Sequence, residues 1–472
     1  MAERPAPDLA VLGAGPAGLA AALAAAAGGV RVVLVDAAGE PGGQFHRQPA
    51  PGLAARHPRV PHRQGRTWRR LRAGLDAYVA DGRITYLADH HVWSVGGQSA
   101  AYSVHALVGP AQEEPVTVRA GAVLLATGGY ERVLPFPGWT LPGVVTAGGA
   151  QAMLKGGLVL PGRTVVVAGG GPLLLPVATG LAAAGARVAA LVESAHPRDF
   201  ARRARQLSAE PVKLAEGARY TAGLLRRRVP VLTGHAVVEA HGDERVTAVT
   251  VAALDAEGQA RPGTLRRFSC DALAVGHGML PHTDLAEALG CRLEGAGVHV
   301  DDEQRTDVPG VWAAGESTGI GGAALALAEG HVAGRSAAAR LRGREPDPRE
   351  WAAAGRARTR LRTFFAALEH AYGPPAWWPE QVSDDTVVCR CEEVTAGTVR
   401  AATGRLGAGD LRTVKLLTRA GMGWCQGRMC EPGVAAVTGC ELIPGRRMLA
   451  RPVPLGALAR EPGEHPDTSD RG

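Results

Sequence analysis

The chain has 472 residues, of which 46% are hydrophobic and 21% are charged, a composition typical of folded globular proteins. No run of about 18 or more apolar residues lacks glycine-rich breaks, and the polar N-terminus does not resemble a signal peptide, so we expect a cytoplasmic protein without a membrane span. The net charge is +7, but the basic residues are almost all arginine and their runs contain no aromatic residues, which disfavours a nucleic-acid partner.

A strand, a glycine turn, an alanine-rich helix and a second strand are predicted over residues 8–36. The turn contains Gly13, Gly15 and Gly18, and Asp36 ends the second strand. Glycines allow a tight turn and let the backbone approach a pyrophosphate at the helix N-terminus, while the carboxylate can bind both ribose hydroxyls. The segment therefore predicts an adenine-dinucleotide site, and a turn that binds no ligand is the alternative.

Three later segments favour FAD over NAD in this first site. They are PGGQ at 41–44, ATG at 126–128 and the Gly-Glu pair at 315–316. Together they resemble the flavoprotein reductases with two dinucleotide-binding domains, in which the last motif holds the ribityl and phosphate portion of the flavin. That family usually has Asp where this chain has Glu316. The residues assigned to FAD are Gly13, Gly15, Gly18, Asp36, Gly42, Gly43, Gln44, Thr127, Gly128, Gly315 and Glu316.

Residues 163–193 repeat the strand, turn, helix and strand pattern and predict a second dinucleotide-type domain. Gly169 and Gly171 belong to the turn, Leu174 stands where a third glycine is usual, and Glu193 ends the second strand. NADP is disfavoured because no arginine directly follows that strand. The pattern leaves open whether this second site binds NAD(H), binds another nucleotide or is purely structural.

Four cysteines near the C-terminus form two close pairs, Cys389 with Cys391 and Cys425 with Cys430. A cluster of two irons bridged by two sulfides takes four terminal thiolates, two on each iron. The spacing therefore predicts a 2Fe-2S site, with helix N-termini near the thiolates. Zinc is the alternative, disfavoured by the one-residue gap, and a vestigial site is the third reading. We expect Cys270, Cys291 and Cys440 to be small buried hydrophobic residues.

The CRCEEVT and GMGWCQGRMC motifs resemble the bacterioferritin-associated-ferredoxin-like 2Fe-2S module. Residues 134–178 resemble the flavoprotein α subunits of multi-subunit opine oxidases, hydroxyproline or proline dehydrogenases, hydrogen cyanide synthases and sarcosine oxidases. We expect no large folate-binding C-terminal domain of the kind found in sarcosine oxidase α, which favours the opine or hydroxyproline type. The resemblance implies a hetero-oligomer with a D-amino-acid-oxidase-like flavoprotein β subunit, which oxidises the substrate, and a small ferredoxin-like subunit.

The predicted fold is α/β, with two Rossmann-like domains of the flavoprotein reductase type and a small helical 2Fe-2S module. The expected divisions are a discontinuous FAD-binding domain at 1–147 and 278–342, an NAD(P)-binding-like domain at 148–277, a helix and linker at 343–385, the 2Fe-2S module at 386–445 and a tail at 446–472. The favoured function is electron transfer within an amine or imino-acid dehydrogenase complex. A stand-alone NAD(P)H-dependent reductase and a non-catalytic scaffold are the alternatives, and no catalytic residue is assigned.

Overall fold

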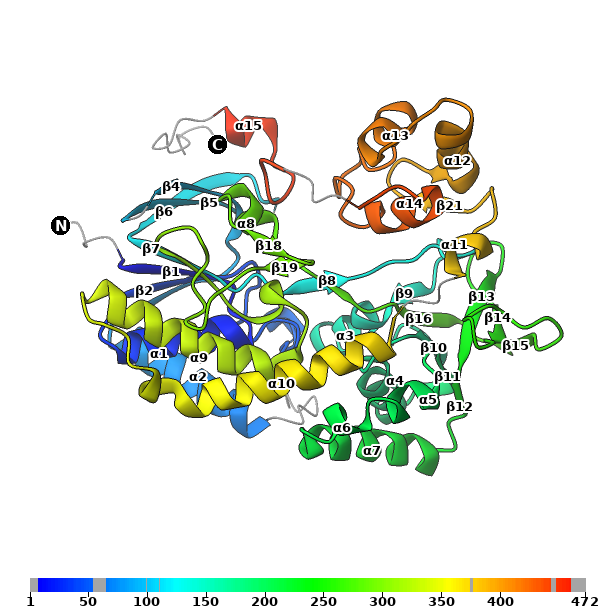
Figure 1. Cartoon of the computed structure of the whole chain (residues 1–472), viewed down its shortest axis with the longest axis horizontal. Helices are drawn as coiled ribbons and strands as arrows, with labels where there is room; N and C mark the ends of the chain where they lie inside the picture. Colours follow the sequence, from blue (N-terminus) through cyan, green and yellow to red (C-terminus); the bar gives the residue numbers. More distant parts are fainter. Residues whose placement is uncertain are drawn as a thin grey trace.

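The computed structural model describes residues 7–53, 65–98, 100–109, 111–373, 377–442 and 447–459. A five-stranded parallel sheet, the first sheet, has the strand order β20-β7-β1-β2-β3 (Figure 1). Its strands are β1 Leu9–Leu12, β2 Val32–Val35, β3 Ile84–Leu87, β7 Ala122–Leu125 and β20 Val311–Ala313. Every residue of β1, β2 and β7 is buried, as expected for parallel strands that are covered on both faces.

One face of the first sheet is covered by three helices, α1 Pro16–Ala27, α2 Gly65–Ala80 and α9 Gly322–Leu341. Helices α1 and α9 consist largely of alanine and glycine because they touch each other closely. A Cβ at Gly330 would lie 2.1 Å from the carbonyl oxygen of Ala17, and one at Gly334 would lie 2.3 Å from that of Ala21. The opposite face is covered by an antiparallel sheet of β4 His91–Gln98, β5 Ala101–Val108 and β6 Glu114–Ala120.

A second parallel sheet has the order β12-β11-β10-β16-β9. Its strands are β9 Val144–Thr146, β10 Thr164–Gly169, β11 Arg187–Glu193, β12 Val231–Thr233 and β16 Ala272–Gly276. Helices α3 Ala147–Gly156, α4 Leu174–Ala183 and α7 Pro211–Arg226 share a hydrophobic core with one face. The antiparallel strands β13 His235–His241, β14 Ala248–Ala253 and β15 Arg266–Ser269 pack on the other. The predicted fold class of two dinucleotide-type sheets is confirmed.

We call the part built on the first sheet the first half and the part built on the second sheet the second half. The two halves are joined by a ribbon of β8 Gly129–Glu131 and β17 Met279–Pro281, which pair antiparallel. The short elements α8 Asp284–Ala288, β18 Leu293–Glu294, β19 Gly297–Val298 and the 3-10 turn η2 Gly315–Thr318 return the chain to the first sheet. The remaining short elements are η1 Pro51–Leu53, α5 Pro197–Ala201 and α6 Ala204–Leu207. β9 begins a few residues before the predicted domain boundary at 148, and the boundaries themselves stay predictions.

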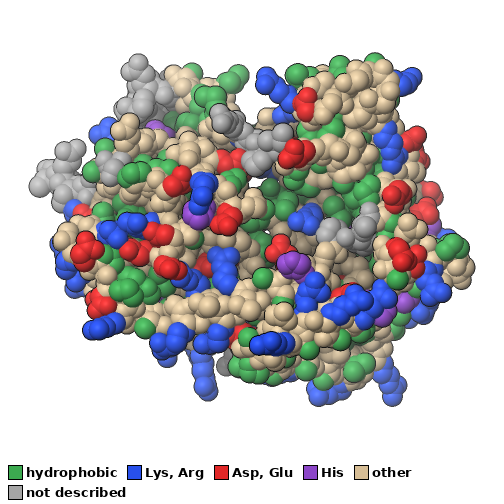
Figure 2. All heavy atoms as spheres, viewed as in Figure 1, with side chains coloured by type: hydrophobic (Ala, Val, Ile, Leu, Met, Phe, Trp, Pro, Cys, Tyr) green, Lys and Arg blue, Asp and Glu red, His purple; other side chains and the backbone are tan. Residues whose placement is uncertain are grey.

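Helix α10, Ala352–Ala371, follows the 3-10 turn η3 Pro348–Trp351 and lies along both halves like a strap (Figure 1). Arg362 reaches the first half, where its Nε lies 2.8 Å from a carboxylate oxygen of Glu329 on α9. Arg360 reaches the second half and bonds Glu210 at 3.0 Å. On the face shown in Figure 2, Lys and Arg side chains gather along the lower edge, over α10, α6 and α7. The segment predicted as a helix and linker therefore fastens the two halves together.

Beyond the strap lies the cysteine module, whose elements are α11 Trp378–Gln381, β21 Val387–Cys389, β22 Val394–Thr395, α12 Ala396–Gly404, α13 Leu411–Thr418 and α14 Glu431–Thr438. Two indole groups dock it. Trp378 donates to the carbonyl oxygen of Pro135 at 2.9 Å, and Trp139 donates to that of Val387 at 2.6 Å. Trp377 and Trp378, which belong to the predicted linker at 343–385, are both buried.

The last described segment, residues 447–459, returns to the first half and includes α15 Leu455–Leu458. The backbone N–H of Ala450 bonds the carbonyl oxygen of Trp93 at 2.8 Å. This segment is the described part of the predicted tail at 446–472, and residues 446 and 460–472 lie outside the described residues. No helix within the described ranges is long and apolar enough to cross a membrane.

Replacing Arg362 with leucine should destabilise the protein. The Glu329 side chain is 0% exposed and would lose its cation. Breaking a buried ion pair from one side costs about 3–5 kcal/mol, and the partial exposure of Arg362 places the expected loss near the lower end, about 3 kcal/mol. Urea denaturation of the full chain measures it. Arg356→Leu, an exposed position on the same helix, is the matched control and should cost less than about 0.5 kcal/mol. Equal losses in both variants would contradict the role of the pair.

Candidate functional site

The first glycine turn has the geometry expected of a dinucleotide-binding turn. Gly13 has a φ of +108°, and a Cβ there would lie 2.3 Å from the carbonyl oxygen of Ala126. A Cβ at Gly18 would lie 1.7 Å from the carbonyl oxygen of Gly13, so the close packing of α1 requires glycine. Helix α1 starts at Pro16 directly after Gly15, and no side chain caps it. Its N-terminal amides are therefore placed to bind a phosphate group.

Asp36 lies beside this turn. One of its carboxylate oxygens accepts a hydrogen bond from the backbone N–H of Ala14, and the other accepts one from Ala38 at 2.7 Å. Burial raises the pKa of Asp36, against the opposing effect of those two hydrogen bonds. The carboxylate is thus held by backbone amides at the end of β2, where the ribose of a dinucleotide binds.

The predicted PGGQ segment packs directly on the first turn. The backbone N–H of Gly42 bonds the carbonyl oxygen of Ala14 at 2.8 Å. A Cβ at Gly43 would lie 2.8 Å from the Cα of Gly15, so the two backbones touch. Gln44 follows, and its side-chain oxygen accepts from Arg47 at 2.5 Å. The structure therefore brings residues 13–15 and 42–44 together, as the sequence predicts.

The Gly315–Glu316 pair lies at the same edge of the first sheet. A Cβ at Gly315 would lie 2.7 Å from the Cβ of Ala17 at the start of α1. Burial raises the pKa of Glu316, although its carboxylate accepts a hydrogen bond from the backbone N–H of Gly322. Glu329 on α9 fixes this turn. It accepts one hydrogen bond from the backbone N–H of Gly315 at 2.9 Å and another from the hydroxyl of Thr318 at 3.1 Å. Sequence analysis missed Glu329 and its partner Arg362.

The second glycine turn resembles the first in its carboxylate and differs in its helix. Glu193 accepts from the backbone N–H groups of Gly171 at 3.4 Å and Ala195 at 3.0 Å, the counterpart of the Asp36 contacts. Burial raises its pKa to about 8. However, α4 starts only at Leu174, three residues beyond Gly171, whereas α1 starts directly after Gly15. The later helix start accommodates the leucine that stands in place of the third glycine.

Residues from the C-terminal end of the strap cover this second turn. A Cβ at Gly170 would lie 3.7 Å from the carbonyl oxygen of Tyr372, whose ring packs against Phe200 at 5.1 Å between centroids. Burial and the charge of Glu193 raise the pKa of Tyr372. Tyr372 therefore lies next to the second turn, at van der Waals distance from the Gly170 position.

A cavity of about 20 Å³ lies at the carboxyl end of the second sheet, where a dinucleotide would pass. It is lined by Gly169, Ser194, His277, Trp377 and Trp378, among others. The volume suits one water molecule. Among the described residues, His277 Nε2 and Trp377 Nε1 are buried without a hydrogen-bond partner, and both residues line this cavity. The two tryptophans therefore border the cavity next to Gly169.

The four predicted cysteines meet in the cysteine module. The thiols lie close enough to affect one another, since Cys430 and Cys391 alter the pKa of Cys425, and Cys425 and Cys389 alter that of Cys430. Cys389 and Cys430 are buried, Cys425 is partly buried and Cys391 is exposed. Among the residues that the structure describes, no three or more His, Cys, Asp or Glu side chains surround one metal-ion position. A group of four neighbouring thiols fits a two-iron centre with two terminal thiolates on each iron.

Local hydrogen bonds favour negative charge at two of these sulfurs, those of Cys389 and Cys425. The backbone N–H of Gly421 donates to Cys389 Sγ at 3.4 Å. The Cys430 thiol and the backbone N–H groups of Met429 and Gly427 lower the pKa of Cys425 to about 5, although burial opposes them. Cys430 itself begins helix α14 as its N-cap. A thiolate is the form of cysteine that binds metal, so the loop is prepared for ligation.

Of the remaining cysteines, Cys270 and Cys291 are buried, and burial raises the pKa of each thiol to about 11. Both are the small buried hydrophobic residues that we expected. Cys440 is only partly buried.

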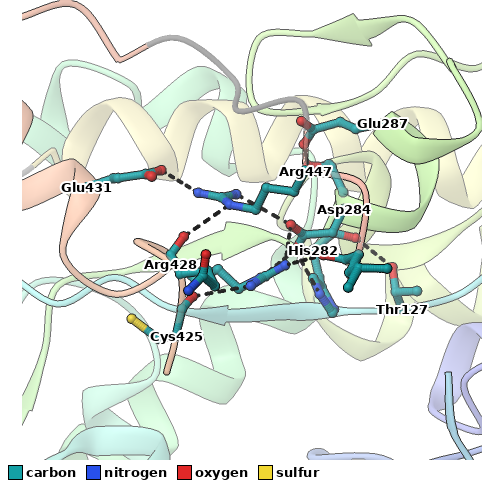
Figure 3. Close-up of polar contacts among 11 residues, drawn as sticks. Thr127, His282, Asp284, Glu287, Cys425, Arg428, Glu431 and Arg447 are labelled. Atoms are coloured by element: carbon teal, nitrogen blue, oxygen red, sulfur yellow. Dashed lines mark hydrogen bonds and ion pairs between the residues drawn. The ribbon is translucent and has the colours of Figure 1, made fainter. Parts of the chain in front are cut away.

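A network of charged residues that sequence analysis missed connects the cysteine module to the first half (Figure 3). Arg428, between Cys425 and Cys430, donates two hydrogen bonds to Asp284 at 3.0 and 3.1 Å. Asp284 also bonds His282 Nε2 at 3.1 Å. The carbonyl oxygen of His282 accepts from the hydroxyl of Thr127 at 2.6 Å, and its backbone N–H donates to Gly128 at 3.0 Å. The predicted flavin-binding turn and the cysteines therefore belong to one connected network.

Comparison with known proteins identifies the family. Residues 7–337 match the pyridine nucleotide-disulphide oxidoreductase family, and residues 387–437, which include all four cysteines, match the BFD-like [2Fe-2S] binding domain. The chain is 36% identical to hydrogen cyanide synthase subunit HcnB of Pseudomonas aeruginosa, over 89% of this chain and 90% of that protein. It is 35% identical to an opine oxidase subunit of Rhizobium meliloti, over 90% of each.

The fold has solved relatives. L-proline dehydrogenase from P. horikoshii superposes with a TM-score of 0.64 over 97% of this chain and 80% of that one, at 20% identity. The predicted resemblance, the FAD cofactor and the 2Fe-2S cluster are confirmed by these matches, and zinc is not supported. The chain belongs to the pyridine nucleotide-disulphide oxidoreductase family, as a flavin-dependent oxidoreductase with a C-terminal BFD-like [2Fe-2S] binding domain.

Proposed function

We propose that this chain is the electron-transferring subunit of an amine or imino-acid dehydrogenase complex of the opine, D-hydroxyproline or proline type. The observation that carries the proposal is the network from Arg428 through Asp284 and His282 to Thr127. It joins the loop that contains Cys425 and Cys430 to the turn that we assign to FAD. Bound FAD exchanges one or two electrons and a 2Fe-2S cluster exchanges one. Residues of this chain would hold the two groups in one rigid arrangement.

The ligand assignment within this proposal follows the geometry. Gly13, Gly15, Gly18 and Asp36 would bind the adenosine-diphosphate end of FAD, because the uncapped start of α1 and the carboxylate face the same turn. Gly42, Gly43, Gln44, Thr127, Gly128, Gly315 and Glu316 would surround the rest. Cys389, Cys391, Cys425 and Cys430 would ligate the cluster.

We further propose that the amine is oxidised in a separate D-amino-acid-oxidase-like flavoprotein subunit, and that a small ferredoxin-like protein is a further partner. The relatives named above are themselves called subunits, which supports a hetero-oligomer. The surface near the cysteine loop also favours contact with a partner. Trp424 is 73% exposed, Met448 is 86% exposed and Met429 is 39% exposed. Large apolar side chains of this kind are typical anchors of protein interfaces.

A stand-alone NAD(P)H-dependent reductase is the second candidate. The Glu193 contacts, which match those of Asp36, favour it. The contact of Tyr372 with the second turn at Gly170 and the position of Trp377 at the adjacent cavity count against it. The two functions therefore differ in their electron source, which is a partner flavoprotein in the first and NAD(P)H in the second.

Replacing Cys425 with serine should remove the visible absorbance of the cluster and the bound iron, because one of four thiolates is lost, while FAD stays bound. Absorbance, iron content and flavin content of the purified chain measure this. Cys440→Ser is the matched control in the same module and should keep both cofactors. An iron–sulfur spectrum that survives in Cys425→Ser would contradict the ligand assignment.

Millimolar NADH should leave the flavin absorbance of the isolated, anaerobic chain unchanged, because Tyr372 and Trp377 obstruct the second site. Dithionite serves as the positive control and should bleach both cofactors. A D-amino-acid-oxidase-like partner, purified with this chain and supplied with its amine substrate, should bleach the flavin. Rapid bleaching by NADH alone would instead favour the stand-alone reductase.

A further inference from the structure

Arg428 lies inside the cysteine loop, residues 421–430, and its contacts point out of the cysteine module. Its side chain is 13% exposed and donates two hydrogen bonds to Asp284, at 3.0 and 3.1 Å. It also donates to the carbonyl oxygens of Cys425 at 3.2 Å and Leu449 at 3.0 Å. One arginine therefore ties the loop to two other segments of the chain (Figure 3).

Asp284 is the acceptor at which these contacts meet. Its side chain is 6% exposed, and it begins α8 in the part of the chain that packs on the first sheet. Besides Arg428 it contacts His282 Nε2 at 3.1 Å and Arg447 at 3.4 Å. Burial alone would raise the pKa of Asp284, but the hydrogen bonds from His282 and Arg428 outweigh burial and lower it to about 2. The carboxylate is therefore charged at neutral pH.

His282 continues the connection toward the flavin-binding turn through its main chain. Its carbonyl oxygen accepts from the Thr127 hydroxyl at 2.6 Å, and its backbone N–H donates to the carbonyl oxygen of Gly128 at 3.0 Å. Its ring packs edge-on against Tyr130 at 6.1 Å. A displacement of Asp284 would therefore act on both the loop and the turn.

We infer that Asp284 is a positioning residue that fixes the cysteine loop against the Thr127–Gly128 turn and balances the Arg428 cation beside the cluster. The inference rests on the proposed function. Near the loop, Arg428 and Arg447 pair with Asp284 and Glu431. The reduction potential of an iron–sulfur cluster depends on nearby charge and on solvent exposure. Without the Asp284 carboxylate, an unbalanced buried cation would favour the reduced cluster.

The test is Asp284→Asn in the full chain with both cofactors. We expect the reduction potential of the cluster to shift to a more positive value. The backbone amides of residues 421–430 should exchange hydrogen about tenfold faster or more, because a hydrogen bond between charged groups contributes enough to change local opening by that factor. Iron and FAD contents should stay at the wild-type level.

Asp384→Asn is the matched control. Asp384 pairs with Arg400 at 2.5 Å in the same part of the chain, but its side chain is 76% exposed, so neither readout should change. A loop that merely lost packing would exchange faster without the positive shift in potential. An Asp284→Asn variant that matches the wild type in both readouts would overturn the inference.

A second variant keeps the inference testable if Asp284→Asn does not fold. Asp284→Asn combined with Arg428→Gln leaves no unpaired buried charge in this pair, and its loop should still exchange about tenfold faster than wild type. Unchanged exchange in this double variant would overturn the inference. If the wild-type chain binds no cluster or FAD, the proposed function fails by itself, and hydrogen exchange still decides whether Asp284 anchors the loop.

Discussion

Two buried carboxylates of the first half, Glu329 and Asp284, each need a cation, and in both cases the cation comes from a later segment. Arg362 of the strap pairs with Glu329, and Arg428 of the cysteine loop pairs with Asp284. A buried charge without a partner is strongly unfavourable, so the segments after residue 342 cannot leave the first half without a large cost in free energy. These two pairs attach the strap and the cysteine module to the first half.

Both pairs are also connected by hydrogen bonds to residues that we assign to FAD. Glu329 holds the backbone N–H of Gly315, and Asp284 holds His282, whose main chain bonds Thr127 and Gly128. The same contacts that attach the C-terminal segments therefore shape the flavin-binding edge. A chain whose function is to pass electrons between two bound groups needs a constant separation between them, and buried ion pairs provide a rigid connection of that kind. Beside the second glycine turn lie Tyr372, whose carbonyl oxygen faces Gly170, and the tryptophans Trp377 and Trp378, which line the adjacent cavity.

Much of this could be predicted from sequence because the signals are local. The glycines at 13, 15 and 18 and the carboxylate at 36 lie within one strand–turn–helix–strand unit, and the cysteine pairs are short motifs. The contacts Arg428–Asp284 and Arg362–Glu329 could not be predicted, because the partners belong to different elements and no periodicity links them. The contact between Tyr372 and the second glycine turn could not be predicted for the same reason. Leu174 did signal an altered turn, and the later start of α4 is its structural consequence.

The central claim is that one chain carries a flavin and a two-iron cluster in a fixed arrangement. The most direct measurement is the content of FAD, iron and acid-labile sulfide in the purified full chain, together with electron paramagnetic resonance after reduction. We predict about one FAD, about two irons and about two sulfides per chain, with a paramagnetic signal from a reduced 2Fe-2S cluster. Zinc in place of iron, or a chain that retains iron and sulfide but no flavin, would contradict the account.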